Sequence, residues 1–181
     1  KNGIDQTAVE GIADLNYDIP HQYTDYVMKN TPIPVGFWRS VGHSHNAFFI
    51  ESLIDEIAHA TDKDPYQLRR TLLSHKPEFI KVLDTLAEKS AWQKTIAPER
   101  FRGMAIHQSF GSIVGQVAEV SVDKTGGFKV HRVVCVVDCG IAVNPATIEA
   151  QMQGSIVYGL SALKQAITIK AGHVEQSNFS D

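Results

Sequence analysis

The chain has 181 residues, of which 43% are hydrophobic and 20% are charged, and its formal net charge at pH 7 is −3. This composition is typical of a globular protein with a real core, and it argues against a chain that is disordered throughout. The negative charge also argues against a general nucleic-acid binder, which needs a basic surface to neutralise phosphates.

The first 35 residues are irregular and contain three prolines. Alternation of apolar and polar residues in YTDYVMK predicts one strand over residues 23–29. The TPIPVG segment that follows is expected to be extended, because proline biases the preceding residue away from the helical region.

Three helices are predicted between residues 44 and 92. The first begins at Ser44 or Asn46, which are both good N-caps. The second begins at Pro65 after the cap Asp64, and the third runs from Pro77 to about residue 92. In the first helix, the helical period gives an apolar inner face and a polar outer face: Ile50, Leu53, Ile54 and Ile57, against Glu51, Asp55 and His59.

From residue 101 onwards the pattern changes to strands. RGMAIHQSF, GQVAEVSVD and FKVHRVVCVVD predict three strands, with a hairpin turn at DKTGG. A helix then begins at Pro145 after the cap Asn144, and a last hairpin turns at residues 171–172. Two glycines inside this helix, Gly154 and Gly159, predict close backbone packing or a ligand. Its apolar side is expected to be buried and comprises Ile148, Met152, Leu160 and Leu163.

The predicted fold class is therefore α+β, with a mixed, mostly antiparallel sheet and several helices. We expect two parts: residues 1–100, with the irregular segment and the helical region, and residues 101–181, with the β-meander, the glycine-bearing helix and the terminal hairpin. The chain opens without methionine and closes in mid-pattern, so we expect both parts to belong to one larger subunit.

The stretch GFWRSVGHSHNAF, residues 36–48, is the strongest candidate for a binding site. The planar guanidinium of Arg39 suits a carboxylate, a phosphate or an aromatic ring, and Phe37 and Trp38 offer flat apolar surface beside it. Gly42 allows a ligand to approach the backbone where the next helix presents its N-terminus. The alternative is a surface arginine whose aliphatic stem covers a loop.

Other polar residues support structural roles at least as well as functional ones. His43 and His45 are spaced like metal ligands, but no fixed third ligand accompanies them, and hydrogen bonds to nearby carbonyls are favoured. Arg69 and Arg70 face different directions on one helix, so one is expected to be solvated and the other to form an internal ion pair. Glu119 suits either a buried or an exposed strand position, and Cys135 and Cys139 are expected to be buried or half-buried free thiols.

Across nearly the whole chain, the motifs resemble the molybdenum-binding subunit of the xanthine dehydrogenase/aldehyde oxidase superfamily, in its isoquinoline 1-oxidoreductase beta branch. The likeness is carried by TPIPVGFWRSVGHSHNAFFIESLIDEIAHATDKDPYQLRRTLL, HQSFGSIVGQVAEVSV, HRVVCVVDCGIAVNP and QMQGSIVYGLSALKQAITIKAGHVEQSNF. The family loop F-R-G-F-G corresponds to residues 38–42, with Ser40 in place of a glycine and Val41 in place of a phenylalanine.

The resemblance implies hydroxylation of an aldehyde or N-heterocycle, with oxygen taken from water and molybdopterin as the cofactor. It assigns Arg39 to the substrate or transition state, Phe37 and Trp38 to the substrate pocket, and Gly42 and Arg69 to the cofactor. It also implies a small iron–sulfur subunit with two [2Fe–2S] clusters and an electron acceptor such as a cytochrome. The family's general-base glutamate, in a GEP-like motif, is absent from these residues. The alternative is a non-catalytic scaffold that keeps the fold without the cofactor.

Overall fold

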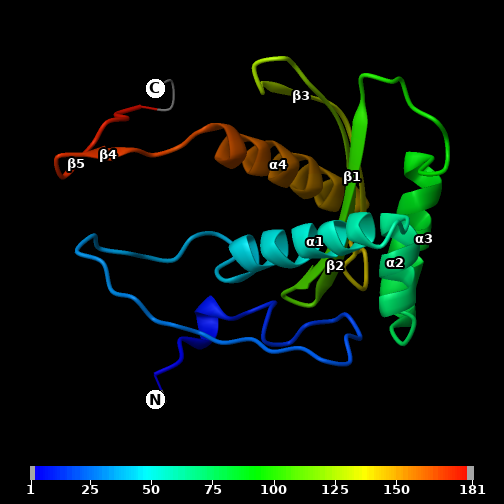
Figure 1. Cartoon of the computed structure of the whole chain (residues 1–181), viewed down its shortest axis with the longest axis horizontal. Helices are drawn as coiled ribbons and strands as arrows, with labels where there is room; N and C mark the ends of the chain where they lie inside the picture. Colours follow the sequence, from blue (N-terminus) through cyan, green and yellow to red (C-terminus); the bar gives the residue numbers. More distant parts are fainter. Residues whose placement is uncertain (1–2, 179–181) are drawn as a thin grey trace. The chain divides into compact units, whose positions relative to one another are not determined.

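The computed structural model describes residues 3–178, which form two compact units that divide between Gly140 and Ile141 (Figure 1). Residue 100, where the sequence pattern changes from helices to strands, lies inside the first unit. The first unit contains η1 (Gln6–Ala8), α1 (His43–Ala60), α2 (Pro65–Leu72), α3 (Pro77–Ser90), β1 (Phe101–Ser109), β2 (Ser112–Val122) and β3 (Phe128–Asp138). The second contains α4 (Pro145–Lys164), β4 (Ile169–Lys170) and β5 (His173–Val174). The predicted α+β class is confirmed.

The three long strands form an antiparallel sheet in the order β1-β2-β3, as the meander pattern predicts. The first hairpin turns at Phe110 and Gly111, which both have positive φ. In the second, Asp123 Oδ1 accepts hydrogen bonds from the N–H groups of Thr125 and Gly127. Local turn chemistry therefore fixes both connections and with them the register of the sheet.

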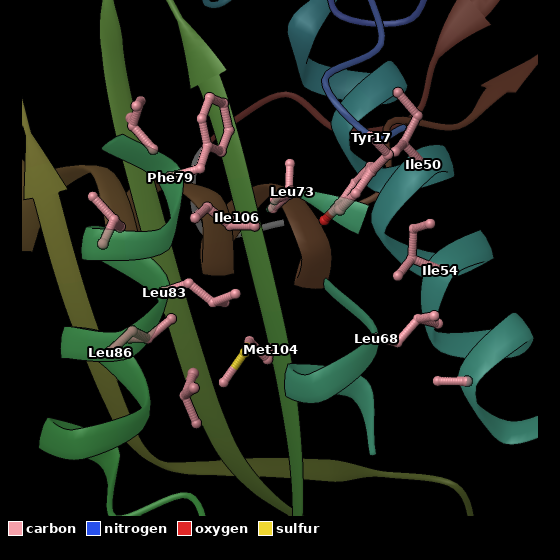
Figure 2. Close-up of a cluster of buried hydrophobic side chains, with 14 residues drawn as sticks. Tyr17, Ile50, Ile54, Leu68, Leu73, Phe79, Leu83, Leu86, Met104 and Ile106 are labelled. Atoms are coloured by element: carbon pink, nitrogen blue, oxygen red, sulfur yellow. The ribbon is translucent and has the colours of Figure 1, made fainter. Parts of the chain in front are cut away.

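One face of the sheet packs against α3. Alternate residues of β2 are buried, beginning at Ile113, because successive side chains of a strand point to opposite faces. A Cβ placed on Gly115 would lie 3.0 Å from a Leu86 methyl carbon and 3.2 Å from a Val82 methyl carbon, so α3 approaches the strand closely there. Figure 2 shows this core, which also receives Ile50 and Ile54 from α1 and Leu68 from α2.

The strand predicted over residues 23–29 is wrong. Residues 22–38 contain no helix or strand, and Tyr23 and Val27 are 88% and 70% exposed. An alternating pattern yields a strand only where a second strand supplies hydrogen-bond partners, and no strand within residues 3–178 pairs with this segment.

The helix α4 begins as predicted, because Asn144 Oδ1 accepts a hydrogen bond from the Thr147 N–H and Pro145 occupies the first position. Its predicted apolar side is the least exposed one, since Ile148, Met152 and Leu160 are half-buried, but no residue of α4 is fully buried and Leu163 is 65% exposed. A Cβ at Gly154 or at Gly159 would meet no atom within 4 Å. The predicted close packing at these glycines is therefore not found within the described residues.

Three smaller predictions are settled by burial. Cys135 is a half-buried free thiol, as expected, and burial raises its pKa. Cys139 is exposed, so the prediction of a buried thiol is wrong there. Glu119 is buried, which is one of the two positions that the sequence left open, and its carboxylate lies 3.5 Å from Arg132 and 3.7 Å from Arg100.

None of the described helices combines the length and the apolar character that a membrane crossing requires.

Candidate functional site

The Arg39 loop, residues 36–42, consists of two consecutive tight turns that lead into α1. The Val41 N–H donates to the Trp38 carbonyl oxygen at 3.0 Å, and the His43 N–H donates to the Ser40 carbonyl oxygen at 3.0 Å. Ser40 and Val41 have φ values of +68° and +50°. The two turns share Ser40 and Val41 and lie just before the helix begins.

These positive φ values make the loop a strained one. Left-handed backbone is rare for residues with a Cβ and rarest for β-branched residues such as valine. Each such residue costs on the order of 1–3 kcal/mol and persists only where its surroundings hold it. The related family loop has a glycine where this chain has Ser40, and glycine adopts positive φ without this penalty.

Three predicted site residues of the loop lie on the surface. Phe37 is 82% exposed, Trp38 is 55% exposed, and Arg39 is also exposed. The cavity described below is lined by other residues. A substrate pocket at Phe37 and Trp38 and a cavity around Arg39 therefore stay predictions.

Two serine hydroxyls meet at the carbonyl oxygen of Arg39. Ser40 Oγ lies 2.5 Å from that oxygen and Ser44 Oγ lies 2.9 Å from it, while the two hydroxyl oxygens are 2.6 Å apart. We call these three groups the serine clamp. The prediction that Ser44 caps α1 is wrong, because the N-cap is Gly42 and Ser44 lies inside the first turn.

The start of α1 is fixed to the N-terminal segment. Asn46, the other predicted cap, is buried, and its Nδ2 donates to the carbonyl oxygens of Ala8 and Glu10, both at 2.9 Å. A Cβ on Gly42 would lie 2.3 Å from the Thr7 carbonyl oxygen. The missing side chain of Gly42 is thus used for packing against residues 7–10, so this geometry gives no support to the predicted cofactor contact there.

Gly42→Ala is expected to lower the free energy of unfolding by about 1–3 kcal/mol, because the new methyl group overpacks the contact with Thr7. The matched control is Gly36→Ala in the same loop, where a Cβ meets nothing within 4 Å. Urea unfolding of both variants measures the difference, and equal stabilities would contradict the packing role of Gly42.

Among residues 3–178, the polar residue with the least exposed surface is Arg69, whose side chain is fully buried. Its Nε donates to Glu51 Oε2 at 3.0 Å, and its two terminal nitrogens donate to Asp55 Oδ1 at 2.6 Å and to the Glu51 carbonyl oxygen at 3.0 Å. The internal ion pair predicted for this helix is confirmed, whereas Arg70 pairs with Asp84 at the surface. The predicted contact between Arg69 and a cofactor has no support in this geometry, because the guanidinium is enclosed.

Glu51 links three parts of the first unit, although the helical pattern places it on the polar face of α1. Tyr17 OH donates to its Oε1 at 2.7 Å, and the Ile106 N–H, at the outer edge of β1, donates to its Oε2 at 2.9 Å. This hydrogen bond satisfies a backbone group that an edge strand otherwise leaves unpaired. The prediction of an outward-facing Glu51 is therefore wrong, since Arg69 and the strand edge attract the carboxylate inward.

Burial and charge act against each other in this network. Burial raises the pKa of the Glu51 carboxyl, while the Arg69 guanidinium and the Ile106 N–H oppose that shift. Burial also raises the pKa of Tyr17, and the Glu51 carboxylate adds to the effect. Burial disfavours the charge on Arg69, but the combined effect of Glu51, Tyr17 and Asp55 outweighs it, and the pKa of Arg69 is raised. Because every side-chain partner of Glu51 is a donor, the geometry is that of an ionised carboxylate.

A small cavity of about 10 Å³ lies beside this network, between Tyr17, Glu51, Ile106 and His107. Its size is about that of a single water molecule. It is therefore too small for an organic substrate or a cofactor.

The two predicted zinc ligands go to different neighbours. His43 Nδ1 lies 2.9 Å from His107 Nε2, whereas the His45 ring packs edge-on against Phe49. Within residues 3–178 no group of three or more His, Cys, Asp or Glu side chains could hold a metal ion. His43 instead forms a histidine pair with His107, which the sequence did not indicate.

Acidification is expected to weaken the first unit through His107. Burial lowers the pKa of His107, and His43 lowers it further, against the opposing effect of Asp14. The unfolded chain therefore takes up this proton at a higher pH than the folded chain does. Stability is full above pH of about 6.5, the unfolded value, and is lost as pH falls toward the folded pKa.

Urea unfolding between pH 7.5 and pH 5 measures this loss, which is at most about 1.4 kcal/mol per pH unit for one proton. His107→Gln is expected to reduce the slope, with His59→Gln at an exposed position of α1 as the control. An unchanged slope in His107→Gln would contradict the assignment.

Comparison with known proteins identifies the family. Two sequence models, both described as the molybdopterin cofactor-binding domain, match residues 3–73 and 55–181. The chain belongs to the molybdopterin cofactor-binding domain family. The predicted superfamily is thereby confirmed, although no solved structure matches the chain.

Among the relatives of this molybdopterin-binding chain is the beta subunit of isoquinoline 1-oxidoreductase from Brevundimonas diminuta, which is 33% identical over 171 residues, covering 91% of this chain and 22% of the relative. A nicotinate dehydrogenase subunit of Pseudomonas putida is 33% identical, over 90% of this chain and 15% of the relative. A membrane-bound aldehyde dehydrogenase [pyrroloquinoline-quinone] of Gluconacetobacter polyoxogenes is 31% identical, over 70% and 19%. The chain thus spans about a fifth of the length of these curated relatives.

Proposed function

We propose that this chain is a segment of the large subunit of a molybdenum hydroxylase, which oxidises an aldehyde or an N-heteroaromatic compound with water as the source of oxygen. The observation that carries the proposal is the likeness to the isoquinoline 1-oxidoreductase beta chain, which extends over 91% of this chain. The names of the relatives include two N-heteroaromatic compounds and an aldehyde, which supports this substrate class.

The geometry gives no support to the two predicted cofactor contacts. Residues 7–10 occupy the space beside the Gly42 Cα atom, and Glu51 and Asp55 enclose the Arg69 guanidinium, so neither residue offers a surface to a bound group. Arg39, by contrast, is exposed, and a guanidinium suits an anionic or carbonyl oxygen of a substrate; the preceding residue, Trp38, is 55% exposed. The cofactor supplies the redox chemistry when it is bound.

In this proposal Arg39 binds the polar group of the substrate and stabilises the negative charge that develops during the reaction. A guanidinium held in place before the reaction stabilises such charge without reorganisation at the moment of reaction. Phe37 and Trp38 would contact the flat ring of the substrate. The proposed partners are a small subunit with two [2Fe–2S] clusters and an electron acceptor such as a cytochrome.

Elemental analysis of the full-length protein tests the proposal. Expressed with the cofactor-maturation machinery, the protein is expected to carry about one molybdenum per large subunit and to oxidise an aldehyde or an N-heteroaromatic compound. Absence of molybdenum would favour the alternative, a scaffold that keeps the fold without the cofactor. A glutamate in a GEP-like motif elsewhere in the full-length protein would further support catalysis.

A further inference from the structure

We infer that Ser40 and Ser44 are positioning residues, whose hydroxyl groups hold the Arg39 loop in the strained conformation that presents the arginine. The inference rests on the proposed function, since it concerns the presentation of Arg39. Neither serine is expected to touch the substrate. Their contacts are to each other and to the backbone of the loop.

Strain creates the need for such a clamp. Ser40 and Val41 are consecutive left-handed residues without the freedom of glycine. Two such residues together cost on the order of 2–6 kcal/mol. Left to itself, the loop would relax to ordinary backbone angles and carry the Arg39 side chain with it.

The serine clamp acts on the carbonyl oxygen of Arg39. Both hydroxyls lie within hydrogen-bond distance of the Arg39 carbonyl oxygen, at 2.5 Å and 2.9 Å, and they lie 2.6 Å from each other. This carbonyl belongs to the peptide bond that joins Arg39 to Ser40. When the orientation of this carbonyl is fixed, the backbone that carries the Arg39 side chain is fixed too.

Ser44 also connects the loop to a rigid support. It lies in the first turn of α1, where Gly42 packs against residues 7–10 and Asn46 binds two carbonyl oxygens of that segment. The first turn is thus held by two independent contacts with this segment. Through Ser44, the loop is attached to this fixed turn.

The test uses the full-length protein and hydrogen–deuterium exchange of a peptide that covers residues 38–46. Ser44→Ala removes one hydroxyl and is expected to speed exchange in this peptide and to lower kcat/KM by about tenfold to a hundredfold, a typical loss for a misplaced catalytic group. Ser44→Thr keeps a hydroxyl and is expected to restore both values. Ser40→Gly removes the other hydroxyl but also relieves the strain, so it is expected to cost less activity than Ser40→Ala.

A double variant separates positioning from general support of the fold. In an Arg39→Ala background, Ser44→Ala is expected to cause no further loss of kcat/KM, because there is no guanidinium left to place. A further loss of the same size, or unchanged exchange in Ser44→Ala, would overturn the inference while the proposed function stands. Unchanged turnover in Arg39→Ala alone would instead overturn the proposed role of Arg39, and the positioning role with it.

Discussion

Glu51→Ala is expected to lower the free energy of unfolding by about 3–5 kcal/mol, the usual cost of removing one partner from a buried ion pair. The substitution removes the acceptor of three donors, on Tyr17, Arg69 and Ile106. Arg69 would keep only Asp55 as a charged partner. Since α1, α2, β1 and the N-terminal segment all meet at this carboxylate, the loss is expected to affect the whole first unit.

Urea unfolding followed by circular dichroism measures this effect. Glu56→Ala is the matched control, because Glu56 is an exposed glutamate on the same helix, and it is expected to change stability by no more than about 0.5 kcal/mol. The double variant Glu51→Ala/Arg69→Ala is expected to lose less than the sum of the two single losses, since neither charge is then left unpaired. A loss below about 1 kcal/mol in Glu51→Ala would contradict the role assigned to the network.

Arg39→Ala in the full-length protein is expected to lower kcat/KM by about a hundredfold to a thousandfold, the usual effect of removing one group that stabilises developing charge. Molybdenum content is expected to stay unchanged, because Arg39 is proposed to act on the substrate. Arg39→Lys is expected to recover only part of the loss, since an ammonium group cannot bind an oxygen pair with two parallel hydrogen bonds.

The control for this substitution is Arg70→Ala, which also removes an exposed arginine. Arg70 pairs with Asp84 at the surface, and such pairs contribute about 0–1 kcal/mol. Steady-state kinetics on an aldehyde and on an N-heteroaromatic substrate measure both variants. Full activity in Arg39→Ala would exclude Arg39 from the mechanism.

Arg69 and Glu51 also show how far sequence reasoning reaches. The sequence predicts that either Arg69 or Arg70 forms an internal ion pair, because two adjacent arginines on one helix face different directions, and the structure identifies it as Arg69. The polar pattern of α1 assigns its partner Glu51 to the wrong face. A signal is nevertheless present, since Glu51 lies three residues before Ile54 and seven before Ala58, both buried, and therefore on the apolar stripe of the helix.

Other parts of the site carry no local signal. Tyr17 and His107 lie 34 and 64 residues from the side chains that they contact, Glu51 and His43. Gly42 looks like a residue that opens the backbone to a ligand, and only the approach of Thr7 shows that packing uses the space. Contacts between segments that are distant in the sequence leave no periodic pattern, so inspection of one segment does not reveal them.

The sequence by itself determined the helices α1 to α4, the β-meander with its second turn at DKTGG, and the family, because caps, prolines, hydrophobic periods and extended motifs are local properties of the chain. Tertiary structure alone decided that Glu51 turns inward, that residues 23–29 stay unpaired and that α4 buries no residue. The physical reason is that burial and strand pairing depend on which partner surface is present, and a segment does not encode its partner.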